Sequence, residues 1–385
     1  MTYRPRRFRM LAYHASPARL LLLAFGLLVL AACHETTDGC DAVGYQPSGS
    51  PIAFSALEAS VRSRAVGDGE LTTSLLQSQS FGVYCWYTQG RDFDFTRHAK
   101  ESATYVLMYN QPIVYDATES PQWTYTPSKY WPLLASEKLT FRAYAPYTAT
   151  MAYDAKGMPL LPVTVASTDY HNGTQHDPLW GTGCFDGEER FGALYNDYTC
   201  AMSGSALTTD SRDGTVDWYF HHGMAKLVFR GQLAEDAQDG EVTITGISVS
   251  PLYTSGQLDI SSQARNQYDK PVWLSRTGDM TVALAAADLK PSVVLVKNAE
   301  RELLDKGLLI IPRDFDGDHP LTITVTYETE GSVQHTATAT LTQPLQGNTV
   351  YTFDMLVNPV TNAVSVRMRV NLDWQAGGYF LVDDL

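Results

Sequence analysis

The chain has 385 residues, of which 44% are hydrophobic and 11% aromatic. This content is enough to form hydrophobic cores, and it excludes a chain that is disordered throughout. The formal net charge of -14 excludes a nucleic-acid-binding protein, because such a protein needs a basic surface to neutralise phosphates. A domain usually holds about 150 residues, so the length predicts two domains.

The first residues have the pattern of a bacterial lipoprotein signal. Arginines stand at positions 4, 6, 7, 9 and 19, and an uninterrupted apolar run follows at residues 20–32. The run is too short to span about 30 Å of hydrocarbon and has the length of a signal-peptide core. Small residues directly precede Cys33, which looks like a lipobox. We therefore predict a signal peptide over residues 1–32 and a diacylated, palmitate-bearing Cys33; a plain secretory signal is the alternative.

The segment after Cys33 is predicted to be a tether over residues 33–51, because it is polar, punctuated by Gly, Pro and Ser, and not periodic. It lacks the aspartate after the cysteine that favours retention in the inner membrane, so we expect transport to the outer membrane. The first strand is expected at residues 52–56, where Ile52, Phe54 and Ala56 are the alternating apolar positions.

Four further cysteines, at positions 40, 85, 184 and 200, allow three disulfide connectivities in an oxidising compartment. Cys184 and Cys200 flank a stretch rich in Gly, Asp and Tyr that is typical of a loop, so we predict that they pair. Closing a loop of about 15 residues would stabilise the fold by about 3 kcal/mol. The spacings favour no metal site, and we predict no metal and no cofactor.

Most of the remaining chain alternates apolar and polar residues with a period of two, which is typical of half-buried strands. Gly, Asn and Asp clusters separate these segments, and only residues 71–78 and 280–289 have a pattern that a helix could also adopt. The pattern predicts an all-β protein of antiparallel sandwiches. The predicted strands are residues 81–87, 138–145, 218–220, 225–230, 242–249 and 321–328, the last in a hairpin with 336–342.

The weakest strand pattern lies at residues 159–214, where Gly, Asp, His and Thr are frequent. We place the domain boundary there. The prediction is an N-terminal β-sandwich domain at residues 52–200 and a C-terminal one at 201–385.

Several strings in this order resemble the fimbrillin family, the subunits of type V pili on anaerobic bacteria. Each string is weak alone, but together they cover most of the chain after the lipobox. The sequence departs from the family pattern at residues 176–180 and in the insertion that carries Cys184 and Cys200. The strings are residues 64–69, 81–84, 123–125, 130–132, 139–146, 220–229, 308–312 and 351–353.

The resemblance implies two transthyretin-like β-sandwich domains, few short helices and export as a surface lipoprotein. It also implies cleavage after an arginine, loss of the first strand, and its replacement by a strand from another subunit. A sheet that lacks one strand exposes unpaired main-chain groups beside an apolar groove, and strand addition satisfies both. The displaced strand would carry Ile52, Phe54 and Ala56.

Arg62 and Arg64 are the predicted maturation site. They lie between the short first strand and the strand at residues 81–87, in a polar Ser, Gly and Asp context that a protease can reach. The alternative is that both are solvated linker charges. The predicted donor strand lies behind two glycines at the C-terminus and consists of Tyr379, Phe380, Leu381 and Val382; its alternative is an edge strand of its own domain.

Other clusters have weaker functional interpretations. Asp314, Asp316 and Asp318 have the spacing of calcium ligands, but no bidentate glutamate follows at the right distance and an ordinary turn explains them. His221 and His222 are adjacent in a strand, point to opposite faces and therefore do not share a metal. Carboxylates at 188, 189 and 197 lie in no catalytic motif, so we predict no enzyme.

The sequence therefore predicts a structural or adhesive subunit of surface fimbriae, located at the outer membrane. Its expected partners are other fimbrial subunits, with host or bacterial surface proteins or glycans as further candidates, and no nucleic acid. The alternative is a stand-alone surface lipoprotein that binds glycans or proteins. Exposed Trp180 and Tyr195 would then stack on sugar rings; an equal interpretation is that both residues cover the sandwich.

Overall fold

The structure is a computed structural model, and it describes part of the chain. The described residues are 44–56, 73–89, 91, 93–94, 105–134, 137, 139–185, 188–189, 215–237, 242–261, 270–291, 293–330, 333–371 and 380–381. All of them lie in one compact unit that spans residues 40–385. The predicted domain boundary at 200 and 201, the signal peptide and Cys33 lie outside the described residues.

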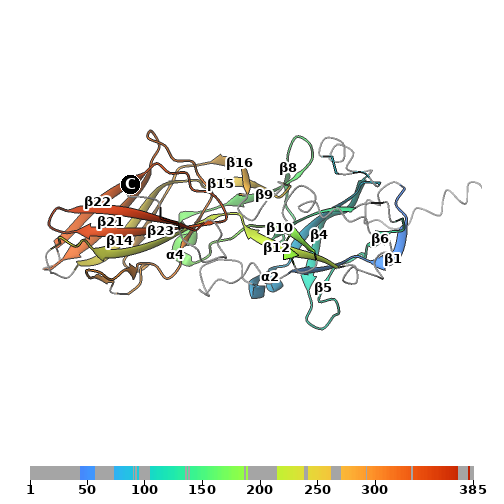
Figure 1. The fold of residues 1–385 in the computed structure, drawn as a ribbon, viewed down its shortest axis with the longest axis horizontal. Helices are drawn as coiled ribbons and strands as arrows, with labels where there is room; N and C mark the ends of the chain where they lie inside the picture. The colour runs from blue at the N-terminus through green and yellow to red at the C-terminus, as the bar shows by residue number, and fades with distance from the viewer. Residues whose placement is uncertain are drawn as a thin grey trace, which may run out of the picture. The chain divides into compact units, whose positions relative to one another are not determined.

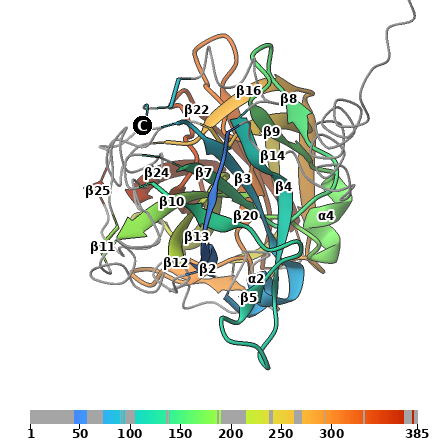
Figure 2. The ribbon, with the colours of Figure 1, turned by 90° about the vertical axis from the view of Figure 1, so that its right-hand side faces the viewer.

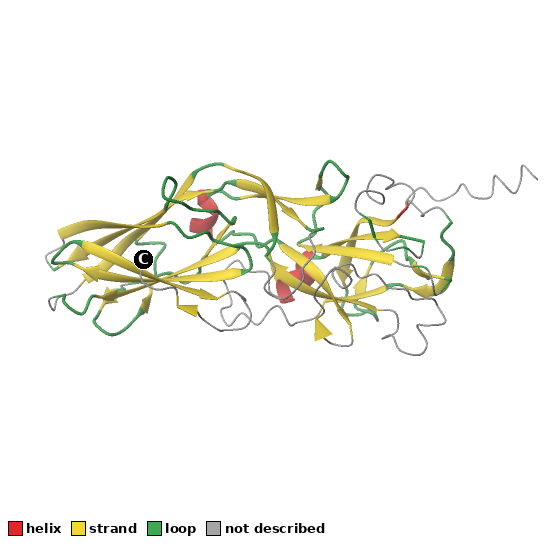
Figure 3. Cartoon of the chain, turned by 45° about the horizontal axis from the view of Figure 1, so that its top comes forward, coloured by secondary structure: helices red, strands yellow, loops and turns green. Residues whose placement is uncertain are grey.

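The described residues form an all-β protein, as predicted, with two short helices, α2 (Thr73–Gln79) and α4 (Ser167–Asn172) (Figure 3). Helix α2 overlaps the predicted helical segment at residues 71–78. None of the helices in the described part of the chain is long and apolar enough to cross a membrane.

The first half of the chain builds a sheet of eight strands (Figure 1). Strand β10 also pairs with β7, so the strand path closes on itself. Figure 2 shows β3 between β4 and β7. In order, the strands are β11 (Glu188–Glu189), β10 (Leu179–Phe185), β12 (Thr215–His222), β2 (Ala53–Ala56), β5 (Trp123–Thr124), β4 (Val106–Tyr115), β3 (Phe81–Tyr87) and β7 (Leu139–Ala145).

A small antiparallel sheet of two strands joins β1 (Pro47–Pro51) to β6 (Tyr130–Pro132). Strand β1 lies at the end of the segment predicted to be a tether. A sheet of four strands has the order β16 (Val272–Thr277), β15 (Ser255–Asp259), β9 (Pro159–Thr164) and β8 (Ala152–Tyr153).

Two further sheets carry the C-terminal half of the chain. One contains β19 (Arg301–Glu302), β20 (Leu308–Ile310), β13 (Ala225–Leu233), β23 (Thr349–Asn358), β24 (Ala363–Asn371) and β25 (Phe380–Leu381), with β13 and β23 parallel. The other contains β17 (Met280–Ala285), β18 (Val294–Leu295), β14 (Val242–Leu252), β21 (Leu321–Thr329) and β22 (Val333–Leu341).

The alternating pattern explains the second of these sheets. Leu321, Ile323 and Val325 on β21 are buried, while the threonines between them are half-buried. The predicted hairpin of β21 with β22 is confirmed, with Ile323 opposite Ala339. The helical alternative for residues 280–289 is wrong at its start, because Met280–Ala285 is strand β17 and alternates buried and exposed positions against β14.

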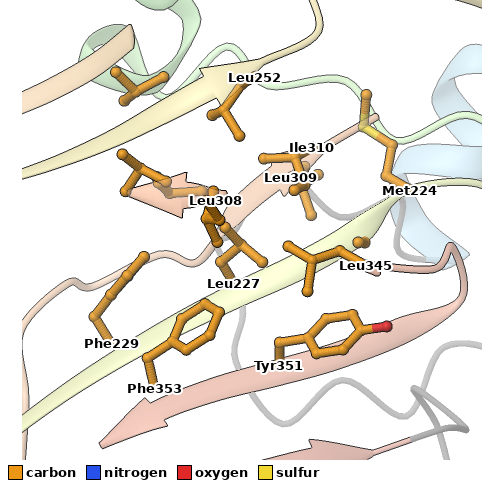
Figure 4. Packing of buried hydrophobic residues seen from close by; sticks show 14 of the residues in the cluster. Met224, Leu227, Phe229, Leu252, Leu308, Leu309, Ile310, Leu345, Tyr351 and Phe353 are labelled. Atoms are coloured by element: carbon orange, nitrogen blue, oxygen red, sulfur yellow. The ribbon is translucent and has the colours of Figure 1, made fainter. Parts of the chain in front are cut away.

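The interiors of these two sheets form one hydrophobic cluster (Figure 4). Figure 4 shows Phe229 of β13 beside Phe353 of β23, and their ring centroids are 5.4 Å apart. Each fully buried side chain of this size stabilises the fold by about 1.5–3 kcal/mol. The parallel register of β13 and β23 therefore places Phe229 and Phe353 side by side on the same apolar face of the sheet.

Strands β3 and β7 are buried on both faces, although their sequences alternate. Tyr84 and Tyr144 belong to the same hydrophobic cluster as Leu161 and Val163 of β9, so the face expected to be wet is covered. Arg142 of β7 is fully buried there. Burial lowers the pKa of Arg142 to about 9, and the Asp259 carboxylate partly offsets this effect.

Candidate functional site: the N-terminal strip and its groove

The candidate site is the place that residues 44–56 occupy, which we call the N-terminal strip. Its strand β2 lies inside the eight-stranded sheet, between β12 and β5. Phe54 is aligned with Val216 of β12 in a parallel ladder and with Trp123 of β5 in an antiparallel one. Because the strand path closes through β10 and β7, β2 is one member of a closed ring of strands.

The predicted apolar positions of the strip face the core of this sheet. Ile52 and Phe54 are 2% and 1% exposed, whereas Ala56 is half-buried and packs against the same cluster. The Phe54 ring has its centroid 6.0 Å from that of Phe141 and 5.5 Å from that of Tyr125. The strip therefore fills an apolar groove with two large side chains.

The polar contacts of the strip come mainly from residues 125–133. The Ile52 amide donates to the Lys129 carbonyl at 2.9 Å, and the Tyr125 hydroxyl donates to the Ile52 carbonyl at 2.8 Å. Further towards the N-terminus, the Leu133 amide donates to the Gln46 carbonyl at 2.8 Å. Main-chain and hydroxyl groups of this kind can hydrogen-bond to the backbone of another extended segment, because backbone hydrogen bonds do not depend on the identity of the side chains.

Cys85 lies in the cluster that the strip covers. Its side chain is fully buried, and it is the free cysteine of the described residues. Burial raises the pKa of the Cys85 thiol, an effect that Lys129 opposes in part. Tyr125, which also holds Ile52, interacts electrostatically with Cys85 as well. The thiol is therefore unreactive while the strip is in place.

The C-terminal end of the chain forms an edge strand. Strand β25 pairs with β24 at the edge of its sheet, with Phe380 opposite Val370 and Leu381 opposite Arg369. These two rungs are the pairing that the predicted donor segment makes with its own domain. Tyr379 and Val382 lie outside the described residues.

The remaining predicted site residues are only partly described. Arg62, Arg64 and Cys200 lie outside the described residues. Cys184 is in strand β10, opposite Asp217 of β12. Its pairing with Cys200 stays a prediction.

We expect non-reducing peptide mapping of protein isolated from cells to show Cys184 joined to Cys200. Cys85 is the internal control, because a fully buried thiol should stay unmodified until the protein is denatured. Free thiols at both Cys184 and Cys200 would contradict the pairing.

The histidine pair has a structural explanation. The His222 Nδ1 atom and the Asp177 carboxylate are 2.6 Å apart in a buried pair, and the ring of His221 packs on Trp180 with centroids 5.1 Å apart. Trp180 is 2% exposed, so it does not stack on sugars, and the other interpretation, that it covers the sandwich, agrees with its burial. It is buried because β10 lies between β7 and β12. Tyr195 lies outside the described residues.

The three aspartates have no common centre. Asp316 accepts hydrogen bonds from the amides of Asp318 and His319, which closes a turn. These bonds lower the pKa of the Asp316 carboxyl. Asp314 instead pairs with Arg276 at 3.3 Å. Among the described residues, no group of three or more His, Cys, Asp or Glu side chains is arranged to hold a metal.

Comparison with known proteins finds solved structures that are similar to this chain. A fimbrial protein from Bacteroides vulgatus has a TM-score of 0.56 at 16% identity, over 83% of this chain and 98% of its own. A proposed cell adhesion protein from Bacteroides uniformis has a TM-score of 0.43 at 14% identity, over 86% and 100%. A tip fimbrial protein from Porphyromonas gingivalis has a TM-score of 0.37 at 10% identity, over 77% and 95%.

The first of these structures shows a shared fold along most of both chains. No curated protein matches the sequence. A family model described as Fimbrillin-like matches residues 192–374. The resemblance predicted from the sequence strings is therefore confirmed, and residues 192–374 of this chain are similar to the fimbrillin-like family.

Proposed function

We propose that this protein is a surface fimbrial subunit that assembles by exchange of the N-terminal strip for a strand of another subunit. Lipidation of Cys33 carries it to the outer membrane, and cleavage after Arg62 or Arg64 frees the strip. The fimbrillin-like match and the fold shared with a fimbrial protein support the class of protein. Cleavage, exchange and lipidation are the specific parts of the proposal.

The observation that carries the proposal is the position of β2. Strand β2 has four residues, of which Phe54 is deeply buried, and the equally buried Ile52 directly precedes it. The strand lies between β12 and β5, and it precedes the two arginines in the chain. Loss of such a strand opens the closed ring and leaves unpaired main-chain groups on both sides of an apolar groove. An incoming strand with alternating apolar residues would satisfy both.

Covalent attachment is what keeps the groove occupied before cleavage. Ile52 and Phe54 contribute roughly 1.5–3 kcal/mol each, in addition to the ladder hydrogen bonds. A strand attached through the chain also has a high effective concentration, which an incoming strand cannot match. After cleavage that advantage disappears, and the strip is held by noncovalent contacts alone.

The C-terminal segment is the proposed donor. Strand β25 lies at an edge, and among the described residues leaving β24 breaks the pairing of Phe380 and Leu381. The segment at residues 379–382 is continuously apolar and aromatic, which suits a groove lined by aromatic rings. The direct test of the proposal is to prevent cleavage at Arg62 and Arg64 and to look for fibres on cells.

Replacing Cys33 by Ala is expected to abolish lipid incorporation and to leave an uncleaved or mislocalised precursor. The reason is that acylation needs the thiol and normally precedes removal of the signal peptide. Metabolic labelling with palmitate measures it, and a Cys40→Ala variant is the control. Undiminished palmitate labelling of the Cys33→Ala protein would contradict the anchor.

A stand-alone adhesin remains the other class of function for such a surface protein. Of the two residues named for glycan binding, Trp180 is buried and cannot stack on a sugar ring, and Tyr195 lies outside the described residues. No described residue favours this alternative, so we propose the assembling subunit.

A further inference from the structure

Three large apolar side chains are exposed beside the beginning of the N-terminal strip. Tyr130, Leu133 and Leu134 are 36%, 47% and 55% exposed, and we call them the Leu133 patch. Tyr130 belongs to β6, whose partner is β1 of the strip (Figure 1). Neighbouring apolar residues on a surface are costly in water unless they meet a partner.

The main chain that carries the Leu133 patch is held in place. The Leu133 amide donates to the Gln46 carbonyl at 2.8 Å, and the Glu137 amide donates to the Leu134 carbonyl at 3.0 Å. The Tyr87 hydroxyl in turn donates to the Glu137 carboxylate. The two leucines are therefore presented from a hydrogen-bonded turn.

The chain itself indicates which surface lies near the patch. Gly44 is the first residue that the structure describes, and it follows Cys33 by 11 positions. Eleven residues reach at most about 40 Å when fully extended. Because Tyr45 donates a hydrogen bond to the Tyr130 carbonyl, the tether enters the fold directly at the patch. A lipid on Cys33 would thus keep the patch close to the bilayer.

The charge around the patch is nearly balanced. Residues 120–136 contain no Asp or Glu and include Lys129, and the acidic group at the turn is the Glu137 carboxylate, which accepts a hydrogen bond from the Tyr87 hydroxyl. A zwitterionic bilayer therefore does not repel this part of the chain. Tyrosine beside leucine is also a combination that favours the interface between headgroups and acyl chains.

We propose that the Leu133 patch rests on the bilayer that holds the lipid of Cys33 until the strip is cleaved. The inference rests on the lipidation of Cys33 in the proposed function. Two leucines and a tyrosine bind a membrane weakly by themselves, but the tether gives them a high effective concentration at the bilayer. Their contact orients the uncleaved subunit with β1 and β6 towards the lipid. Cleavage releases the tether and with it the contact.

The test uses the full-length lipidated protein with Arg62→Ala and Arg64→Ala, reconstituted in phosphatidylcholine vesicles. Some of the phosphatidylcholine carries a diazirine in its acyl chain, and peptides that acquire lipid after irradiation are identified by mass spectrometry. We expect lipid on the peptide with Leu133 and Leu134. The peptide with Val360, which is 62% exposed, is the matched control and should carry none.

Leu133→Ser with Leu134→Ser should reduce the lipid label by at least about fivefold, because most of the inserted apolar area is removed. Val360→Ser should leave the label unchanged. The comparison of the Leu133 and Val360 peptides in the protein without serine substitutions tests the proposal even if the double serine variant fails to fold.

The mass of the intact protein shows whether Cys33 is acylated, so it distinguishes a missing lipid anchor from a missing membrane contact. An unacylated Cys33 would overturn both the anchor and the membrane contact. Acylated protein without lipid on the Leu133 peptide, or with equal label at Val360, would overturn the contact alone. Crosslinks between two copies at Leu133 without lipid label would also overturn it and would assign the patch to a contact between subunits.

Discussion

Replacing both Arg62 and Arg64 by Ala is expected to yield cells that display the protein and no fibres. Cleavage between the strip and β3 would be blocked, so Ile52 and Phe54 would stay in their own groove. An incoming strand would have to displace buried apolar side chains worth about 3–6 kcal/mol, and the strip would return at high effective concentration. Electron microscopy of the cell surface, with immunoblots of the outer-membrane fraction, measures the result.

The matched control is Arg91→Ala, since Arg91 is an exposed arginine of the same half of the chain. It should form normal fibres. A site for an unrelated protease, placed in the segment between residues 57 and 72 of the double variant, should restore fibres when that protease is added. Fibres built from uncleaved subunits would contradict the mechanism. Absence of fibres in the unaltered protein as well would show a subunit that does not polymerise alone.

Phe54→Ala is expected to loosen the strip without removing it. Large-to-small substitution of a buried phenylalanine costs about 3–5 kcal/mol, and Phe54 loses its contacts with Phe81, Tyr125 and Phe141. If the cost falls mainly on local opening, the population of the open groove rises by a factor on the order of 10²–10³. Titration with a denaturant would measure the decrease in the free energy of unfolding.

The buried Cys85 thiol reports this opening directly. It should react with a maleimide far faster in the Phe54→Ala protein, because Cys85 is buried in the same cluster as Phe54 and reaction needs exposure of the thiol. The rate is measured on the Cys85 peptide by mass spectrometry, so the other cysteines do not interfere. Phe353→Ala is the control: Phe353 is equally buried, but in the C-terminal cluster. Equal acceleration in both variants would show global unfolding and would argue against a separately mobile strip.

The strands with strict alternation were predictable because a period of two places all the apolar side chains on one face only when the segment is a strand. The hairpin of β21 and β22 is the clearest case, with its pairing partner identified as well. The helical alternative for residues 280–289 was wrong because a short apolar segment fits both a helix and a strand. Pairing with β14 decided in favour of the strand. The sequence left open whether Trp180 is exposed or covers the sandwich, because the burial of β10 depends on β7 and β12, which are other segments of the chain.

At the candidate site, the sequence identified Ile52 and Phe54 as core positions of a short strand, and their burial agrees. It did not identify Trp123, Tyr125 or Lys129 as the residues that receive this strand. Their aromatic and polar side chains carry no local signal for a partner some 70 positions away. Strand β1 was missed for the same reason, because a segment of Pro, Ser and Gly has no periodicity and becomes a strand only against β6.

The sequence by itself determined the all-β class, the positions of several strands and the resemblance to fimbrillins, because these depend on local alternation and on short strings of residues. Only the tertiary structure decided that β2 is an internal member of a closed ring and that β3 and β7 are buried on both faces. Strand order and the covering of a second face are set by contacts between distant segments. Their free energy depends on the area that the segments bury together, and no single segment encodes it.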